Sequence, residues 1–326
     1  MMKDFSAEYK ERTETADRIV LRHLPEIRGE QKLIMESMDY AVRAGGKRLR
    51  PLMLMTVYEM FINDPARDRC LRPVMEAAMA AIEMIHTFSL CHDDLPCMDN
   101  DRYRRGQESV WFRYGEDFGT LAGDALSLYA FECIGDAFEK ARAEMRPDSG
   151  ISAEQVIRWQ DAVLRTNRIL AGQSGIHGML GGQVVDVEMT GGRLTEEQLM
   201  FVYRLKTGAL IAASFLAGAV LAGAGDQDLE ALSEAAFETG IAFQIRDDIL
   251  DETSTDEELG KPVHSDMENG KTTYVTLHGI HASEEEVARR SAKAADLLRS
   301  LSVPEQNEVH REFLLRLTEA LIARKK

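Results

Sequence analysis

Apolar residues recur three and four positions apart along much of the chain. The periodicity is clear over residues 75–95, 287–301 and 312–324, and it predicts a helix over each range. Clusters of β-branched residues are short by comparison, as in VVDV (184–187) and TTYVT (272–276). The pattern therefore predicts an all-α protein of about ten or more helices, folded as a single domain over residues 1–326.

Helix starts are marked by Ser or Thr followed three positions later by Glu or Gln. This spacing is typical of a capping box, and it occurs at residues 152–155, 195–198, 283–286 and 302–305. Pro304 stands where the first turn of a helix accepts a proline. Each of these positions is predicted to begin a helix.

One uncharged stretch, residues 208–225 (GALIAASFLAGAVLAGAG), approaches the length of a membrane span. It consists mostly of Ala and Gly, so a buried helix of a large bundle explains it better. We therefore expect no stable membrane insertion. The first residues are charged from the third position onward, which is not the pattern of a signal peptide.

Charge narrows the possible partners. The chain has 55 Asp and Glu against 39 Lys and Arg, a formal net charge of −16. This excess argues against nucleic acid as a partner. The four cysteines show neither a disulfide framework nor metal-type spacing, which favours a reducing compartment, the cytoplasm.

A first acidic cluster lies in HDDLPCMDNDRYRRG, where Asp93, Asp94 and Asp99 precede Arg104 and Arg105. The preceding helix places His86 and Asp93 on one face, because they are seven positions apart. Pro96 is expected to end this helix, so that the chain loops and returns Asp99 to Asp93. A solvated acidic helix end is the alternative, but carboxylates there oppose the helix dipole.

A second acidic cluster, FQIRDDILD, places Asp247 and Asp251 on one helical face with Asp248 beside them. Carboxylates that face one another repel unless a cation separates them. Mg²⁺ prefers oxygen ligands and is commonly shared between carboxylates and phosphate oxygens. The two clusters therefore predict bound Mg²⁺, and the metal in turn predicts an anionic substrate.

Basic residues suited to phosphate accompany the clusters. Lys47, Arg48 and Arg50 follow a Gly45-Gly46 turn, which lets cationic side chains and backbone amides approach an anion. The further candidates are polar or cationic and stand in short glycine-containing motifs or beside the aspartates: Arg104, Arg105, Lys206, Thr207, Lys261 and Lys271. We expect these residues to bind diphosphate oxygens.

Taken in order, the motifs resemble those of the trans-polyprenyl diphosphate synthases, in particular the bacterial short-chain farnesyl/geranylgeranyl type. The similarity covers residues 45–274 and is carried by GGKRLRP, IHTFSLCHDDLPCMDND, RRG, GGQVVD, KTGAL, FQIRDDILD, GKPVHSD and NGKTTY. It implies an all-α bundle around a central cavity, usually a homodimer. One departure is Arg102, where the family usually has an aspartate.

The resemblance implies a role for each matching residue. Two or three Mg²⁺ ions would be held by Asp93, Asp94, Asp99, Asp247, Asp248 and Asp251. The allylic diphosphate would be held by Arg104, Lys206, Thr207, Gln244, Lys261 and Lys271. Isopentenyl diphosphate would be held by Lys47, Arg50, His86 and Arg105, and Gly46 is also assigned to substrate binding. Catalysis would rest on Lys206 and the aspartates Asp93, Asp94, Asp99, Asp247 and Asp248.

Product length is expected to depend on the helix before Asp93. Phe88 lies five residues earlier, about 7.5 Å along the axis, and in the resembled family a bulky residue here limits elongation. Ser89 is too small to do so. We therefore expect farnesyl diphosphate, with geranylgeranyl diphosphate as the alternative. Ordinary core packing of Phe88 is the other interpretation.

Three other classes share some of these features. A di-iron bundle needs two Glu-x-x-His pairs, and we find only the one from Glu83 to His86. A non-catalytic partner subunit should lack acidic motifs, which are intact here. Terpene cyclases and head-to-head synthases have aspartate-rich helices, but they leave Lys47, Arg50 and His86 unexplained.

Overall fold

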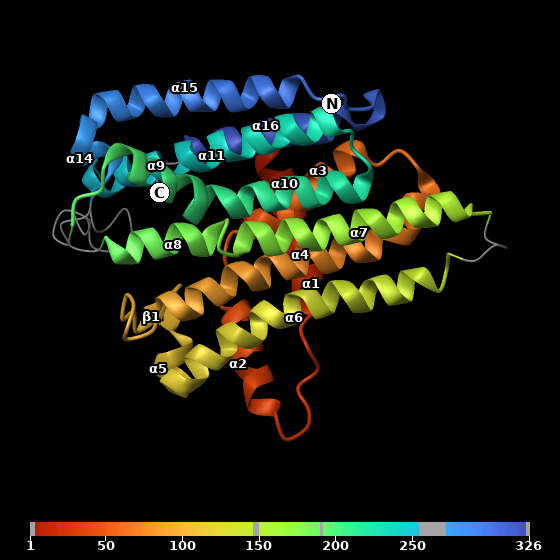
Figure 1. Cartoon of the computed structure of the whole chain (residues 1–326), viewed down its shortest axis with the longest axis horizontal. Helices are drawn as coiled ribbons and strands as arrows, with labels where there is room; N and C mark the ends of the chain where they lie inside the picture. Colours follow the sequence, from red (N-terminus) through yellow and green to blue (C-terminus); the bar gives the residue numbers. More distant parts are fainter. Residues whose placement is uncertain (1–3, 146–149, 190–191, 254–271, 324–326) are drawn as a thin grey trace. The chain divides into compact units, whose positions relative to one another are not determined.

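The computed structural model describes residues 4–145, 150–189, 192–253 and 272–323 (Figure 1). Nearly all of the regular structure in these ranges is helical. Their β-structure is one antiparallel hairpin of two-residue strands, β1 (Tyr103–Arg104) and β2 (Gln107–Glu108). The prediction of an all-α fold is confirmed. Neither short β-branched cluster forms a strand, since both belong to or lead into helices.

Residue contacts divide the chain into two compact units. The first comprises Met1–Asn167 with Ala217–Gly223. Its elements, in chain order, are α1 (Phe5–Arg22), α2 (Lys32–Arg43), α3 (Leu49–Phe61), α4 (Pro65–Asp93), the hairpin, α5 (Val110–Tyr114) and α6 (Glu116–Arg142).

The second unit comprises Arg168–Leu216 with Ala224–Lys326. Its elements are α8 (Met179–Glu188), α9 (Glu196–Val202), the π-helix η2 (Tyr203–Gly208), α11 (Asp226–Thr253), α14 (Tyr274–His278), α15 (Ile280–Arg299), the 3₁₀ turn η3 (Glu305–Asn307) and α16 (Glu308–Ile322). Two helices, α7 (Ala153–Ser174) and α10 (Ala209–Ala222), belong partly to each unit. The single domain stays a prediction.

The central helix of the first unit is α4, which packs along α6 (Figure 1). The Asp64 side chain accepts hydrogen bonds from the backbone N–H groups of Ala66 and Arg67, and Pro65 occupies the first turn. A capped first turn with proline at its start is a strong helix signal. Helix α4 therefore begins at Pro65, ten residues before the start that hydrophobic periodicity indicates, and it ends at Asp93.

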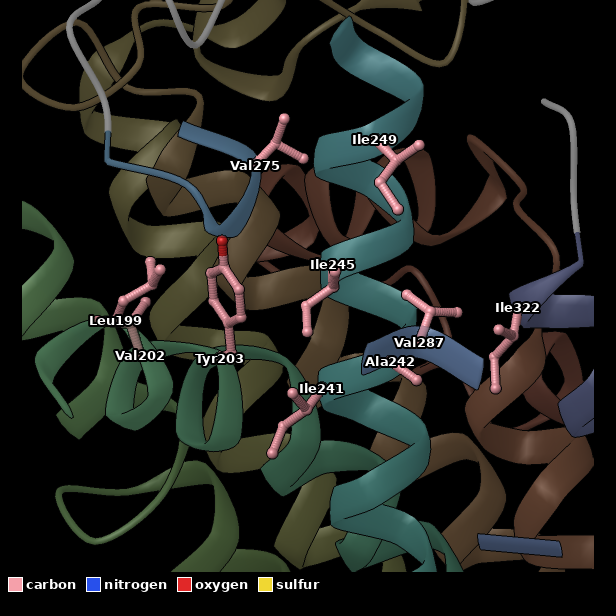
Figure 2. Close-up of a cluster of buried hydrophobic side chains, with 10 residues drawn as sticks. All are labelled: Leu199, Val202, Tyr203, Ile241, Ala242, Ile245, Ile249, Val275, Val287 and Ile322. Carbon is pink, nitrogen blue, oxygen red and sulfur yellow. The ribbon is translucent and has the colours of Figure 1, made fainter. Parts of the chain in front are cut away.

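The second unit is built around α11. Buried apolar side chains of α9, α11, α14, α15 and α16 form one cluster, shown in Figure 2. On α11 the cluster includes Ile241, Ile245 and Ile249, four residues apart and therefore on one face. Its polar member is Tyr203, whose hydroxyl points to the segment that enters α14 (Figure 2). The core thus fixes the orientation of α11, which carries the second acidic cluster.

Two helical segments of the described chain are long and apolar enough to cross a membrane, Pro65–Asp93 and Glu196–Ala222. The most apolar window of each is 78% buried in the protein. The second contains α10, the Ala- and Gly-rich helix that the sequence predicted to be a core helix. Its burial confirms that prediction.

The predicted helix starts have mixed outcomes. Reciprocal capping hydrogen bonds form between Ser152 and Gln155 and between Thr195 and Gln198. The start predicted at residue 283 is wrong, because α15 begins at Ile280 and the Ser283 hydroxyl donates within the helix. The capping box predicted at residue 302 is also wrong, since the Ser302 N–H donates to Asp228 instead.

Candidate active site

The first acidic cluster lies where α4 ends. Asp93 is the last residue of the helix, and the backbone N–H of Asp99 donates to the carbonyl of Asp93 at 2.8 Å. The N–H of Asn100 donates to the carbonyl of Leu95 at 3.1 Å. These bonds confirm the predicted loop after Pro96. Asp93 is half-buried and Asp99 is exposed, and the loop makes them neighbours in space.

Asp94 differs from these two aspartates because its side chain is buried in an ion pair. Its Oδ1 accepts a hydrogen bond from Arg104 Nε at 2.8 Å and a second from Arg104 Nη2. Arg104 Nη2 also donates to Asp101 Oδ2 at 3.1 Å. Burial raises the pKa of the Asp94 carboxyl, and the guanidinium of Arg104 opposes that rise. Sequence reasoning assigned these two residues to metal and to diphosphate, whereas here they bind each other.

The motif Arg-Arg-Gly forms the turn of the hairpin. Arg104 ends β1, and the two residues before β2, Arg105 and Gly106, have φ of 54° and 80°. Two central residues with positive φ are typical of a two-residue type I′ hairpin turn. The hydroxyl of Tyr40 on α2 donates to the carbonyl of Glu108 at 2.7 Å and ties the hairpin to α2. The turn therefore presents Arg105 from a fixed position.

Gly46 lets Arg105 approach the loop before α3. Its φ is 134°, and a Cβ atom there would lie 2.7 Å from Arg105 Cζ. Both the backbone conformation and the space thus favour glycine. The Arg105 guanidinium consequently lies directly against the backbone of the Gly45-Gly46 loop.

A cavity of about 420 Å³ lies among these basic side chains. It is lined by Ala44, Gly46, Lys47, Arg48, Leu49, Arg50, Glu83, His86 and Arg105. The four residues assigned to isopentenyl diphosphate are in this set, and so is Gly46, which was assigned to substrate binding. Arg50 Nε is buried without a hydrogen-bond partner, and burial lowers the pKa of Arg50. A buried donor of this kind is favourably placed to bind an anion.

The surroundings of His86 in the cavity strongly affect its pKa. Burial lowers its pKa well below 6.5, and the nearby guanidinium groups of Arg50 and Arg105 lower it further. The ring is therefore neutral near pH 7. A neutral imidazole donates one hydrogen bond and accepts one, so His86 adds a polar group to the cavity without adding charge.

Arg48 lines the cavity but has an internal role that the sequence did not reveal. Its Nε donates to Asp17 at 2.8 Å, Nη1 to Glu83 at 2.8 Å and Nη2 to the carbonyl of Val42 at 2.7 Å. Its side chain is 1% exposed. Arg48 thereby neutralises Glu83, whose charge would otherwise repel an anionic ligand. The same pairing occupies the glutamate on which the di-iron alternative depended.

The second acidic cluster lies on α11. Gln244, Asp247 and Asp251 are three and four positions apart, so they share one face. Asp248 points elsewhere: its Oδ2 accepts hydrogen bonds from the Tyr203 hydroxyl and from the backbone N–H of Tyr274, the latter at 3.1 Å. The Asp248 carboxylate therefore connects α11 to η2 and to the start of α14.

Lys206 and Thr207 belong to the π-helix η2, which the sequence did not predict. Lys206 Nζ donates to Asp186 Oδ2 at 2.5 Å, and the Thr207 hydroxyl donates to Gln244 Oε1 at 2.9 Å. The structure thus brings together Lys206, Thr207 and Gln244, three of the residues assigned to the allylic diphosphate. Single π-helical turns are rare and frequent at functional sites.

Comparison with known proteins decides the family. The Polyprenyl synthetase family model matches residues 31–300. The chain belongs to the polyprenyl synthetase family. It is 39% identical to the farnesyl diphosphate synthase of Geobacillus stearothermophilus, over 93% of each chain. It is 38% identical to the geranylgeranyl diphosphate synthase of Cyanophora paradoxa, over 84% of this chain and 83% of the relative.

A solved structure of the polyprenyl synthetase kind has the same fold. The geranyltransferase of Helicobacter pylori, complexed with magnesium and isoprenyl diphosphate, superposes with a TM-score of 0.79. The alignment covers 98% of both chains at 27% identity. The similarity therefore extends over both units of this polyprenyl synthetase.

Magnesium suits the donor groups of this polyprenyl synthetase. Asp93, Asp99, Asp247 and Asp251 offer carboxylate oxygens, the ligands that Mg²⁺ prefers. Among the residues that the structure describes, no three His, Cys, Asp or Glu side chains form a complete metal site. In proteins Mg²⁺ is commonly held by one or two carboxylates together with waters and substrate phosphates. The acidic clusters therefore fit Mg²⁺ bound together with a diphosphate.

Phe88, the predicted determinant of product length, is buried on α4. Its ring meets the ring of His92 edge to face, with centroids 5.9 Å apart, and His92 Nε2 lies 3.0 Å from the carbonyl of Thr120 on α6. Ser89 donates its hydroxyl to the carbonyl of His86 at 2.9 Å. The role of Phe88 in product length stays a prediction.

Two predicted site residues, Lys261 and Lys271, lie outside the described residues. The basic C-terminal residues 324–326 do as well. Arg102, which departs from the usual family pattern, lies over the ring of Phe112 at 5.5 Å from its centroid.

Proposed function

We propose that this polyprenyl synthetase is a trans-prenyltransferase that condenses isopentenyl diphosphate with dimethylallyl and geranyl diphosphates to form farnesyl diphosphate. The observation that carries the proposal is the cavity of about 420 Å³ lined by Lys47, Arg50, His86 and Arg105. It offers several cations and one unpartnered guanidinium N–H to an anion. The farnesyl diphosphate synthases among its relatives support the same activity.

The second substrate, the allylic diphosphate, is assigned to a separate group of residues. Lys206 and Thr207 lie in η2, the Thr207 hydroxyl donates to Gln244 on α11, and Gln244 stands three positions before Asp247. Arg104 supplies a further cation beside Asp94. A basic cavity and a separate Lys-Thr-Gln group together fit two diphosphate substrates. A hydrolase that binds one phosphate group would need only one of these two groups of residues.

Magnesium binding is assigned to Asp93, Asp99, Asp247 and Asp251, with two or three ions per site. The magnesium complex of the Helicobacter pylori geranyltransferase supports the choice of metal. When bound, Mg²⁺ neutralises the negative charge that develops on a departing diphosphate.

The condensation needs no side-chain nucleophile. The C1–O bond of the allylic diphosphate breaks, and its electron pair leaves with the diphosphate, which Lys206 and Arg104 stabilise as charge accumulates. The double bond of isopentenyl diphosphate then forms the new carbon–carbon bond at C1, and a proton is lost to the released diphosphate. Lys47, Arg50, His86 and Arg105 are assigned to hold the diphosphate of isopentenyl diphosphate.

A direct assay tests the proposal. Purified protein is incubated with dimethylallyl diphosphate, isopentenyl diphosphate and Mg²⁺, and diphosphate release is followed while products are separated by chromatography. We expect stoichiometric diphosphate release and a fifteen-carbon product. Variants Asp93→Ala and Asp247→Ala should lower turnover by orders of magnitude while circular dichroism shows an intact fold. Absence of any condensation product in the wild-type reaction would refute the activity and favour a non-catalytic subunit.

Product length is tested in the same reaction. If the Phe88 ring limits elongation, Phe88→Ala should shift the products toward twenty carbons or longer. If the ring only packs α4 against α6, the variant loses thermal stability without a change in product. A twenty-carbon product from the wild-type protein would instead establish the alternative, a geranylgeranyl diphosphate synthase.

We assign a homodimeric state and a cytoplasmic location to the enzyme. Support for the dimer comes from apolar side chains that α6 and α7 expose at seven-residue spacing: Leu121, Leu128, Ile157 and Leu164. Large exposed apolar side chains in such rows are typical of a protein interface. Support for the location comes from the four cysteines, which are all free thiols.

A further inference from the structure

Asp94 in the first acidic cluster and Asp248 in the second are buried; Asp251 in the second cluster is buried too, with an exposed fraction of 6%. Asp94 and Asp248 have exposed fractions of 3% and 5%, whereas the residues before them, Asp93 and Asp247, are half-buried. Each of the two buried carboxylates accepts hydrogen bonds from other elements of its unit. A buried carboxylate requires such donors, so these contacts determine the direction in which Asp94 and Asp248 point.

The partner of Asp94 is one of the proposed diphosphate ligands. Two N–H groups of Arg104, Nε and Nη2, converge on Asp94 Oδ1. The hairpin that carries Arg104 has strands of only two residues each, too short to be stable without support. The ion pair of Arg104, next to the turn, therefore supports the hairpin and fixes the direction of the Arg104 side chain.

The partners of Asp248 act on the other proposed diphosphate group. Its Oδ2 accepts from the hydroxyl of Tyr203, the first residue of η2, and from the backbone N–H of Tyr274, the first residue of α14. The same η2 turn carries Lys206 and Thr207. Figure 2 shows the Tyr203 ring held among the apolar side chains of the core, with its hydroxyl directed away from them. Asp248 is the acceptor that this buried hydroxyl needs.

We infer that Asp94 and Asp248 are positioning residues, Asp94 for Arg104 and Asp248, through Tyr203, for Lys206 and Thr207, while the more exposed Asp93, Asp99 and Asp247 are left to bind Mg²⁺. The inference rests on the proposed function, and it replaces the sequence-based assignment of both residues as metal ligands. An Asp94 that turned to a metal would leave Asp101, whose side chain is 51% exposed, as the acceptor for the Arg104 guanidinium. An Asp248 that did so would release the hydroxyl that anchors η2.

A matched pair of variants tests Asp94. Asp93→Asn and Asp94→Asn each remove one charge at nearly constant volume. Mn²⁺, a paramagnetic substitute for Mg²⁺, is titrated into each protein with inorganic diphosphate present, and binding is read by electron paramagnetic resonance. We expect Asp93→Asn to weaken Mn²⁺ binding and Asp94→Asn to leave it unchanged. Asp94→Asn should instead raise KM for the allylic substrate about tenfold or more, as Arg104→Gln does.

A double variant and a control make the Asp94 test specific. If Asp94 acts through Arg104, the pair Asp94→Asn/Arg104→Gln should be no worse than Arg104→Gln alone. Asp101→Asn removes the more exposed acceptor of Arg104 and should change KM little. If Asp94→Asn alone does not fold, the double variant can replace it, because it leaves no unpaired charge at this position. Titration of the double variant with Mn²⁺ then shows whether Asp94 is a metal ligand. Additive effects, or Mn²⁺ binding as weak as in Asp93→Asn, would overturn the inference.

Tyr203→Phe tests Asp248 without altering any carboxylate. Loss of the hydroxyl should raise KM for the allylic substrate and leave KM for isopentenyl diphosphate and Mn²⁺ binding as in the wild type. Normal kinetics in Tyr203→Phe, together with weakened Mn²⁺ binding in Asp248→Asn, would show that Asp248 is a metal ligand. The Mn²⁺ titrations remain informative even if the wild-type protein forms no prenyl product, so failure of the inference and failure of the proposed function are distinguishable.

Discussion

Arg48 and Arg50 are two positions apart, yet they serve opposite purposes. Arg48 has φ of 47°, in the left-handed region, immediately before α3 begins at Leu49. This turn directs its side chain inward to Asp17 and Glu83, where all of its charge is compensated by the protein. Arg50, in the first turn of α3, faces the cavity with an unpartnered Nε. One arginine therefore shapes the site, and the other is placed to bind the substrate.

The depressed pKa of His86 predicts a loss of stability on acidification. Burial lowers this pKa, with Arg50, Arg105, Arg104 and Arg48 adding to the effect. Below about pH 6.5 the unfolded chain binds a proton here that the folded protein does not. The free energy of unfolding should therefore fall as the pH falls from about 6.5 toward the folded-state pKa of His86.

The comparison with His86→Gln isolates this contribution. Denaturant unfolding is measured for both proteins at about pH 7.5 and about pH 5.5. The variant should lose less free energy of unfolding over this interval than the wild type does. Equal losses would mean that other groups cause the acid sensitivity and that the His86 ring is not held neutral by its surroundings.

Two lysines are predicted to serve different substrates. Lys47 lines the basic cavity, whereas Lys206 belongs to the η2 turn. Lys47→Ala should raise KM mainly for isopentenyl diphosphate, and Lys206→Ala mainly for the allylic diphosphate, each by about tenfold or more. Steady-state kinetics with each substrate varied in turn provide the measurement. If either change affects both KM values equally, the assignment of separate sites is incorrect.

At the scale of elements, short sequence patterns predicted those helix ends and helix starts that neighbouring residues determine. Pro96 indicated the loop that returns Asp99 to Asp93, and Thr195 with Gln198 indicated the start of α9. The capping pattern at residue 283 failed because Gly279, with φ of 80°, precedes α15 and begins the helix earlier. A short sequence pattern cannot tell which of two nearby starts the chain uses.

Contacts between distant elements were beyond sequence reasoning. The π-helix η2 depends on close packing in which a Cβ on Gly240 would lie 2.5 Å from the Cα of Gly208. The ion pairs of Arg48 join α1, α3 and α4, and nothing near Arg48 in sequence distinguishes it from Arg50. The residue types of the site were therefore predictable, but the internal partners of its charges were not.

The loop before α3 gives a prediction at the scale of an element. Gly45 and Gly46 both have positive φ, so alanine at either position should cost about 1 kcal/mol of stability. Only at Gly46 would the new Cβ meet the Arg105 guanidinium, since nothing lies within 4 Å of a Cβ at Gly45. Gly46→Ala should therefore also raise KM for isopentenyl diphosphate, while Gly45→Ala should not.

Urea unfolding and steady-state kinetics on the two alanine variants separate strain from contact. Similar losses of stability with different KM values are the expected result. If Gly45→Ala raises KM as much as Gly46→Ala does, flexibility of the loop matters more than the contact with Arg105.

At the scale of the whole molecule, charge and substrate have the same sign. The chain carries a formal net charge of −16, and its proposed substrates are diphosphates. Attraction must therefore come from the local group of Lys47, Arg50 and Arg105, whose field acts within about 10 Å at ordinary ionic strength. A local field of this kind acts on small anions that reach the cavity.

The exposed apolar residues of α6 and α7 lead to the last prediction. Leu128 is 74% and Leu164 is 69% exposed, and each lies seven residues from a second exposed apolar side chain on its helix. If these side chains are buried between two copies of the chain, replacing one by a charge places an unpaired carboxylate in an apolar contact. Leu128→Glu should therefore shift a dimer to a monomer in sedimentation analysis at micromolar concentration.

Val309→Glu is the matched control, because Val309 on α16 is 56% exposed and lies outside these two helices. A wild-type protein that sediments as a monomer, or a Leu128→Glu variant that remains dimeric, would place the dimer contact elsewhere or remove it.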